Sequence, residues 1–318
     1  MKDEESSLDL AVDTQTFVAA CAEQVRDSAH VSVQENALDD LVPLVAGARP
    51  VSWDWFLRNP DGDLAEAAWD FLVTSALNGG YFQECPDGTV RQWEANGSGS
   101  AALIDWYRQL REARLVPGAD ISGRVTALSL LEQRVAGQPH AGERLEILAD
   151  FAEEGARDAF QAILRATAAA PNRHRFTLAD ADRVAGLFPR GFGQDPFRKK
   201  AILVFLLLAG HIESRGGSVE YDLPVPSDYQ IPRILCWKGA ISLSPAFEAK
   251  LRSGGLIDVR SRACRDLRAA AVVMARELGT RAGVDDRFVD GALFMGFRRH
   301  PGFLADAPPP MRCASLWF

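Results

Sequence analysis

Hydrophobic residues recur along most of the chain at the three- and four-residue spacing of amphipathic helices. Near the N-terminus, Phe17, Cys21 and Val25 fall on one helical face. Patterns and end signals of this kind predict further helices over residues 32–46, 64–77, 178–187, 245–252, 261–279 and 287–298. The first of these begins with the spacing of a capping box, Ser32 followed by Glu35. The chain is therefore expected to be mainly helical.

One expected helix is far more apolar than the others. It spans residues 197–212 and contains the run AILVFLLLAG, which is too hydrophobic for a surface helix and too short to cross a membrane. Asp195 followed by Pro196 is a typical helix start. We therefore expect a central buried helix. Its first turn carries Lys199 and Lys200, although the helix dipole disfavours cations there.

The helical spacing is interrupted by a pattern typical of a β-hairpin. Two short aromatic-containing segments, Tyr81–Cys85 and Thr89–Trp93, flank the turn signal Pro86-Asp87-Gly88. Before them, Asn78-Gly79-Gly80 is a helix stop. The expected architecture is a single two-lobed helical domain over residues 14–318 with this small hairpin inserted, preceded by a disordered stretch over residues 1–13.

The stretch 221–239, YDLPVPSDYQIPRILCWKG, differs from its surroundings. Its first two prolines favour an extended backbone, and its third proline and final glycine fit the ends of a short helix, Arg233–Lys238. Asp228 lies at the junction between these two rigid parts, whereas most acidic residues of the chain lie on helical faces. Asp228 is therefore the first candidate for a catalytic residue. The alternative is that its side chain only caps the following turn.

Composition and charge narrow the range of partners. The chain has 318 residues, of which 47% are hydrophobic and 25% charged, and its net charge is −8. An acidic protein is a poor ligand for duplex DNA or an anionic membrane, so a small polar ligand fits better. No apolar run is long enough to span a membrane, and the start MKDEESSLDL lacks a signal-peptide pattern. We expect a cytoplasmic protein.

Cysteine and histidine residues are scattered along the chain. The five cysteines lack CxxC spacing and are odd in number, and the five histidines are equally dispersed. This pattern favours neither a disulfide framework nor a zinc site. We expect no metal and no cofactor.

Several segments, taken in order, resemble the queuosine salvage family of queuosine 5′-phosphate N-glycosylases. The clearest is Ser227-Asp228-Tyr229-Gln230-Ile231-Pro232-Arg233, which is similar to the family's aspartate–tyrosine–x–x–proline–glutamine segment. The other similar segments are Glu143-Arg144, Phe197-Arg198-Lys199-Lys200-Ala201, Asp266-Leu267-Arg268-Ala269, Asp290 to Phe294 and Arg312 to Phe318. No single segment is specific, but their succession covers most of the chain.

The resemblance implies a helical fold similar to helix-hairpin-helix DNA glycosylases, acting on a nucleotide and not on DNA. N-glycosidic hydrolysis passes through a ribosyl cation, so a carboxylate is needed near the anomeric carbon. The family's catalytic aspartate falls on Asp228. Its lysine falls on Lys199, which is expected to point inward and to pair with Asp228 or contact a phosphate, whereas Lys200 is expected to reach solvent.

The expected activity is that of a hydrolase that releases the free base from queuosine 5′-phosphate or from a related 7-deazapurine or purine nucleotide or nucleoside. Arg268, oriented by Asp266, is a candidate phosphate ligand, and a structural ion pair is the alternative. Arg233 replaces the family's glutamine and adds positive charge beside the reactive acid. The remaining candidates for substrate binding, by stacking or polar contact, are Asn78, Tyr81, Phe82, Tyr229 and Arg312.

Departures from the family pattern leave two alternatives open. The family's asparagine–phenylalanine–serine–phenylalanine–tryptophan segment is Asn78-Gly79-Gly80-Tyr81-Phe82 here, and its glycine–tyrosine–tryptophan–serine–leucine segment is Gly99-Ser100-Ala101-Ala102-Leu103. Met311 stands where the family has a histidine. One alternative is a diverged nucleoside hydrolase of specialised metabolism that acts on a different base. The other is a nucleotide-binding protein without turnover.

Overall fold

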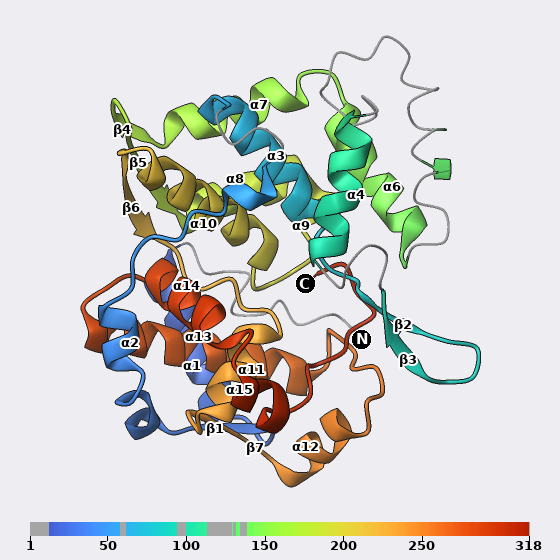
Figure 1. The fold of residues 1–318 in the computed structure, drawn as a ribbon, viewed down its shortest axis with the longest axis vertical. Coiled ribbons are helices and arrows are strands. Elements are labelled where there is room, and N and C mark those ends of the chain that lie inside the picture. The colour runs from blue at the N-terminus through green and yellow to red at the C-terminus, as the bar shows by residue number, and fades with distance from the viewer. Residues whose placement is uncertain are drawn as a thin grey trace. The chain divides into compact units, whose positions relative to one another are not determined.

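The computed structural model describes residues 13–57, 62–93, 100–112, 129, 132–133 and 139–317. Helices predominate and the strands are short, which confirms the mainly helical expectation (Figure 1). The chain divides into two compact units. Unit 1 comprises Met1–Val51, Arg175–Ala179 and Glu220–Cys313, and unit 2 comprises Ser52–His174, Asp180–Val219 and Ala314–Phe318. The expected disordered stretch over residues 1–13 lies almost entirely outside the described residues.

Unit 1 is built on the long helix α13 (Arg262–Ala282). Alanines at positions 269–271 and 275 are buried, so neighbouring backbones approach α13 closely. The elements that pack on α13 are α1 (Thr14–Arg26), β1 (Val31–Val33), η1 (Glu35–Leu38), α2 (Val42–Ala46), α11 (Gln230–Trp237), β7 (Ile241–Leu243) and α14 (Asp286–Phe297). The unit also contains α12 (Pro245–Arg252) and α15 (Pro301–Asp306).

Unit 2 is centred on two buried helices, α3 (Leu64–Leu77) and α10 (Lys199–Ser214), which pack on each other. Nearly every residue of α10 up to Ile212 is buried, as its apolar sequence predicts. The elements that contact this pair include η2 (Asp54–Phe56), α4 (Ser100–Glu112), α6 (Ala141–Ala152) and α9 (Pro189–Phe192). Helix α7 (Ala156–Ala166) packs on α6.

The predicted hairpin is confirmed. Strands β2 (Phe82–Glu84) and β3 (Val90–Gln92) are antiparallel, with Phe82 opposite Gln92. The turn contains Gly88 at a φ of 78°, a backbone conformation that glycine adopts without strain. Helix α3 ends at Leu77, directly before the expected stop.

Other strands were not predicted. The expected helix over residues 32–46 is wrong, because its first part forms β1 and pairs antiparallel with β7. A further three-stranded sheet has the order β4 (Ala168–Ala170), β5 (Arg173–Thr177), β6 (Ser218–Asp222), and β5 leads directly into α8 (Leu178–Leu187). Strands of three to five residues depend on distant partners, so local sequence signals them weakly.

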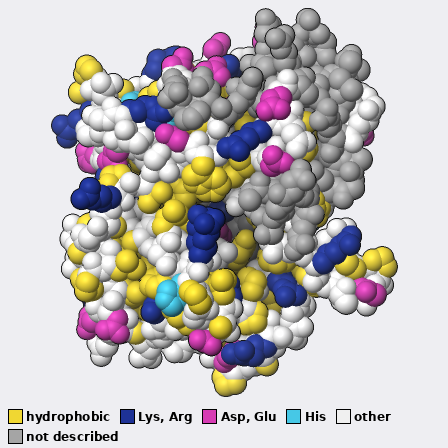
Figure 2. All heavy atoms as spheres, in the orientation of Figure 1, with side chains coloured by type: hydrophobic (Ala, Val, Ile, Leu, Met, Phe, Trp, Pro, Cys, Tyr) yellow, Lys and Arg dark blue, Asp and Glu magenta, His cyan; other side chains and the backbone are white. Residues whose placement is uncertain are grey.

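Among the described residues, no helix combines the length and the apolar character required to cross a bilayer. On the face shown in Figure 2, Lys and Arg side chains are scattered among hydrophobic and uncharged atoms rather than gathered into one basic area. Of the large hydrophobic side chains described, those exposed are Leu44, Trp55, Met295 and Leu304.

Candidate functional site

Asp228 lies in unit 1, where a buried extended segment meets a helix. Every residue of the segment 223–227 is buried, whereas Asp228 and Tyr229 are partly exposed. Helix α11 then begins at Gln230, slightly earlier than predicted. The two prolines of the segment hold it extended, and the change from buried to partly exposed residues brings the Asp228 carboxylate to the surface of the unit. The structure therefore presents this acid from a rigid support.

Neighbouring helices hold the segment on both sides of its prolines. The hydroxyl of Thr14, in α1, donates to the carbonyl of Asp222 at 2.8 Å. The hydroxyl of Ser227 donates to the carbonyl of Arg268 at 3.0 Å, and the Arg268 Nε donates to the carbonyl of Ser227 at 2.9 Å. These reciprocal bonds to α13 fix the residue that precedes Asp228.

The Asp228 side chain also forms an Asx turn at the start of α11, where Tyr229 is the N-cap residue. Its Oδ1 accepts the backbone N–H of Gln230 at 2.6 Å. This is the capping contact that sequence reasoning offered as the alternative to catalysis. The N-terminus of α11 also favours a negative charge at this position. Capping and chemistry are compatible, because the bond to Gln230 fixes the direction of the carboxylate.

Asp266 and Arg268 lie close in sequence but have separate structural partners. Asp266 is fully buried, and its carboxylate accepts from Gln24 Nε2 at 3.0 Å and from the Ser28 hydroxyl at 2.6 Å. Its Oδ1 also lies 2.7 Å from the Nε of Arg262. Asp266 therefore joins α13 to α1, whereas the Nε of Arg268 binds the chain next to Asp228. These contacts favour a structural role for both residues.

Arg233 and Arg312 both donate to main-chain carbonyls. The Nε of Arg233 donates to Pro308 O at 2.5 Å, and its guanidinium lies 4.5 Å from the centre of the Phe303 ring. Burial lowers the pKa of Arg233. The Nη1 of Arg312 donates to the carbonyl of Gly254 at 3.0 Å. Each of these contacts lies within unit 1 and secures the chain between α15 and its C-terminal end.

The other candidates lie in unit 2, around the end of α3. The Tyr81 hydroxyl donates to Asn78 Oδ1, and both residues are buried, as is Phe82. Lys199 is buried as expected, and its backbone N–H donates to Asp195 Oδ2 at 3.0 Å. The candidates therefore fall into two sets: Asn78, Tyr81, Phe82 and Lys199 in unit 2, and Asp228, Tyr229, Arg233, Asp266, Arg268 and Arg312 in unit 1.

The expectation that Lys200 reaches solvent is wrong. Its side chain is buried, and its ammonium donates to the carbonyl of Ala76 at 2.5 Å. The buried guanidinium of Arg144 donates to the carbonyls of Leu77 and Gly79, the latter at 2.7 Å. The last carbonyls of a helix lack intrahelical partners and carry negative partial charge, so two cations at the end of α3 have a clear structural cause.

Burial lowers the pKa values of both Lys200 and Arg144. Burial and the nearby charges of Arg144 and Lys199 lower the pKa of Lys200 well below its usual value. Burial also lowers the pKa of Arg144 to about 10. The side chain of Asp195 acts in the opposite direction on the pKa of Lys200. Unit 2 therefore holds an unusual concentration of buried positive charge around Lys199.

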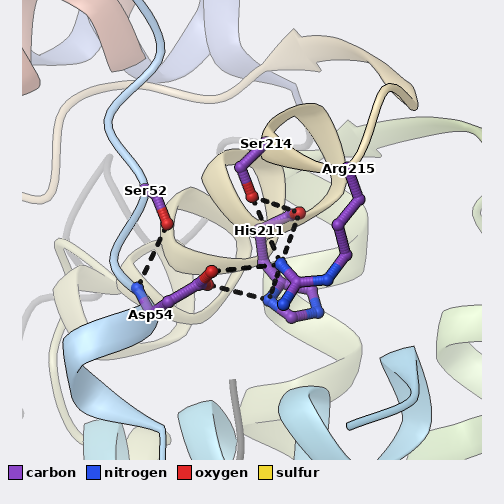
Figure 3. Close-up of polar contacts among 5 residues, drawn as sticks. All are labelled: Ser52, Asp54, His211, Ser214 and Arg215. Carbon is purple, nitrogen blue, oxygen red and sulfur yellow. Dashed lines mark hydrogen bonds and ion pairs between the residues drawn. The ribbon is translucent and has the colours of Figure 1, made fainter. Parts of the chain in front are cut away.

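A polar cluster that sequence reasoning missed lies at the other end of α10 (Figure 3). His211 is buried, and its Nδ1 lies 2.9 Å from Asp54 Oδ1 and 2.9 Å from the Nη1 of Arg215. The same Arg215 nitrogen lies 3.1 Å from Asp54 Oδ2. The only sequence signal was a histidine at the end of an apolar helix, which does not reveal its partner 157 positions earlier.

The proton on Nδ1 decides how this cluster is bonded. A protonated Nδ1 donates to Asp54, and an unprotonated Nδ1 accepts from Arg215. Burial lowers the pKa of His211, although the bond to Asp54 opposes that shift. Burial raises the pKa of Asp54, but hydrogen bonds from His211 and Arg215 outweigh it, so the net shift is downward. The cluster is a carboxylate–imidazole pair that ties η2 to α10.

Within the described ranges, no group of three or more His, Cys, Asp or Glu side chains is arranged to hold a metal ion. Comparison of the chain with models of known protein families and with curated proteins gave no match. The resemblance to the queuosine salvage family thus stays a prediction from the sequence segments that carry it.

Proposed function

We propose that the chain is a cofactor-independent hydrolase of N-glycosidic bonds in a ribonucleotide or ribonucleoside, with Asp228 at the anomeric carbon. The substrate we propose is queuosine 5′-phosphate or a related 7-deazapurine or purine nucleotide, a small molecule and not duplex nucleic acid. The observation that carries the proposal is the position of Asp228 at the point where a buried, proline-braced segment becomes partly exposed.

The chemistry requires a fixed negative charge. As the C1′–N bond breaks, its electron pair leaves with the base and positive charge develops on the ribose. Water adds to C1′, and its proton is transferred, through Asp228 or solvent, to the departing base. A carboxylate already held by the bond from Gln230 stabilises this charge without reorganising during the reaction. The anchoring of Ser227 to Arg268 supplies the rigidity that such preorganisation needs.

Lys199 is assigned to the reaction by the sequence resemblance alone. An ammonium group binds a phosphate group through opposite charge. We therefore expect Lys199→Met to weaken turnover of a phosphorylated substrate more than turnover of the matching nucleoside, as measured by kcat/KM for each.

The direct test measures release of free base. The protein is incubated with queuosine 5′-phosphate, queuosine and a panel of purine nucleotides, and the base is quantified by liquid chromatography and mass spectrometry. Asp228→Asn should lower kcat by at least about 100-fold, because the charge at the anomeric carbon is lost. Asparagine also caps helices, so the turn before α11 is retained.

A matched control separates catalysis from capping. Asp258 Oδ1 accepts the backbone N–H of Arg260 at 2.9 Å, which is the same local geometry as in the Asp228–Gln230 contact, but Asp258 is exposed. Asp258→Asn should leave base release unchanged. Full activity of Asp228→Asn would refute the assigned mechanism. Binding of a nucleotide without release of base from any substrate would instead identify a nucleotide-binding protein.

A further inference from the structure

The connection between α3 and the hairpin, residues 78–81, is held by the side chain of Arg144. This residue of α6 is fully buried, and its guanidinium donates to the main-chain carbonyls of Leu77, of Gly79 at 2.7 Å and of Pro139 at 3.2 Å. Burial lowers the pKa of Arg144 to about 10, so the group stays charged at neutral pH and its bonds are charge-assisted. One arginine thus binds both the end of α3 and the connection that follows.

Close packing adds to these bonds. Gly80 has a φ of 62°, and a Cβ atom there would lie 2.9 Å from the side chains of Leu316 and of His140, the N-cap residue of α6. At the end of the connection, the backbone N–H of Trp93 donates to the carbonyl of Tyr81 at 2.7 Å. The backbone of the connection therefore has one well-defined path, to which α6 contributes both a side-chain clamp and a packing surface.

Two of the candidate substrate-binding residues, Asn78 and Tyr81, are the first and last residues of this connection. The Tyr81 hydroxyl donates to Asn78 Oδ1. This bond uses the acceptor atom of the Asn78 amide and so fixes the direction of its donor atom, Nδ2. A donor with a fixed direction suits an acceptor atom on the edge of a purine-like base. A shift of the connection would move both side chains together.

We propose that Arg144 is a positioning residue for binding of the base: it holds the connection 78–81, and thereby the Asn78 amide and the Tyr81 ring, in the arrangement that binds the substrate. This inference rests on the function proposed above and on the assignment of Asn78 and Tyr81 to substrate binding. The role requires arginine, because a planar guanidinium directs its donors to several carbonyls at once, whereas a lysine ammonium is a single point of charge.

Lys200 provides a matched control. It is a second buried cation at the end of α3, but its ammonium donates to the carbonyl of Ala76, which lies inside the helix and before the connection. Arg144→Lys and Lys200→Met both remove bonds to carbonyls at this helix end, so both should lower stability. Arg144→Lys alone should loosen the connection, since it keeps the charge and loses the fork.

The structural half is tested by amide hydrogen exchange, measured by NMR on the full chain labelled with ¹⁵N-tryptophan. The Trp93 amide is the reporter, because its partner is the carbonyl of Tyr81. We expect it to exchange at least about tenfold faster in Arg144→Lys than in the unchanged protein and to keep its rate in Lys200→Met. Equal rates in all three proteins, or an equal acceleration in both variants, would overturn the inference.

The functional half is tested by the kinetics of base release. Arg144→Lys should raise KM on the order of tenfold with little change in kcat, because contacts to the base are made in the ground state and in the transition state alike. This differs from Asp228→Asn, which should lower kcat. Lys200→Met should keep KM. An unchanged KM in Arg144→Lys, or an equal rise in both variants, would contradict the positioning role.

A further measurement keeps the test decisive if Arg144→Lys does not fold. Asp228→Asn should bind the nucleotide with little turnover, so saturating nucleotide should slow exchange of the Trp93 amide in this variant. Exchange that nucleotide leaves unchanged would overturn the inference. No base release by the unchanged protein would refute the proposed function, and the effect of Arg144→Lys on Trp93 exchange would still decide whether Arg144 holds the connection.

Discussion

Replacing Asp266 separates the structural role of this residue from the substrate-binding role predicted from sequence. Asp266 is fully buried and accepts hydrogen bonds from Gln24 and from the Ser28 hydroxyl. Ser28 in turn accepts the backbone N–H groups of His30 and Val31. The carboxylate thus secures the connection from α1 into β1. Substitution with asparagine keeps the shape of the side chain but removes the charge and one acceptor oxygen.

The expected cost follows from those contacts. Hydrogen bonds to a charged group contribute roughly 1.5–3 kcal/mol each, and Asp266 accepts two in a buried site. The ion pair with Arg262 adds little, because that guanidinium is half exposed and can be solvated after the change. We expect Asp266→Asn to lower the unfolding free energy of unit 1 by about 3 kcal/mol. A large part of this loss should come from the weakened hydrogen bond with Ser28.

The assay is hydrogen exchange by mass spectrometry in increasing urea, read on peptides from α1 and α13. These peptides report on unit 1 alone, so the stability of unit 2 does not enter. A double-mutant cycle with Ser28→Ala should give a coupling energy of at least about 1 kcal/mol. A loss below about 1 kcal/mol together with weakened substrate binding would refute this reasoning and restore Asp266 as a substrate ligand.

Three further predictions concern pH and backbone strain. Burial raises the pKa of Asp286 to about 7 from 3.8, so its contribution to stability is complete below about pH 4 and is lost as pH rises through 7. In urea unfolding, the free energy of unfolding of Asp286→Asn should rise relative to that of the unchanged protein by up to about 4 kcal/mol between pH 4 and 8. A difference between the two proteins that stays constant with pH would contradict this. Burial lowers the pKa of His211, so stability should fall as pH drops below about 6.5, and His211→Gln should lose that dependence in the same measurement. Gly80 has a φ of 62°, and a Cβ atom at this position would lie 2.9 Å from the side chains of His140 and Leu316. Gly80→Ala should therefore lower the melting temperature more than Gly88→Ala, because Gly88 has a φ of 78° but open space around it. An equal fall in melting temperature in both variants would show that the contacts with His140 and Leu316 do not matter.

Short-range patterns in the sequence determined much of the helical framework. The apolar run that forms α10, the hairpin around Gly88 and the proline-braced extended segment before Asp228 all depend on residues within a few positions of one another. Hydrophobic period, proline geometry and turn chemistry act over that distance. They are therefore visible without any knowledge of tertiary contacts.

The tertiary structure decided which of several locally plausible partners each polar residue takes. Lys200 binds the carbonyl of Ala76, 124 positions away, instead of reaching solvent, and Asp266 binds Gln24 and Ser28 across more than 230 positions. Ser32 and its two neighbours form strand β1 instead of the start of a helix, because they pair with β7. A buried charge or a strand edge is stabilised only by the group that the fold brings to it, and that group is unmarked in the local sequence.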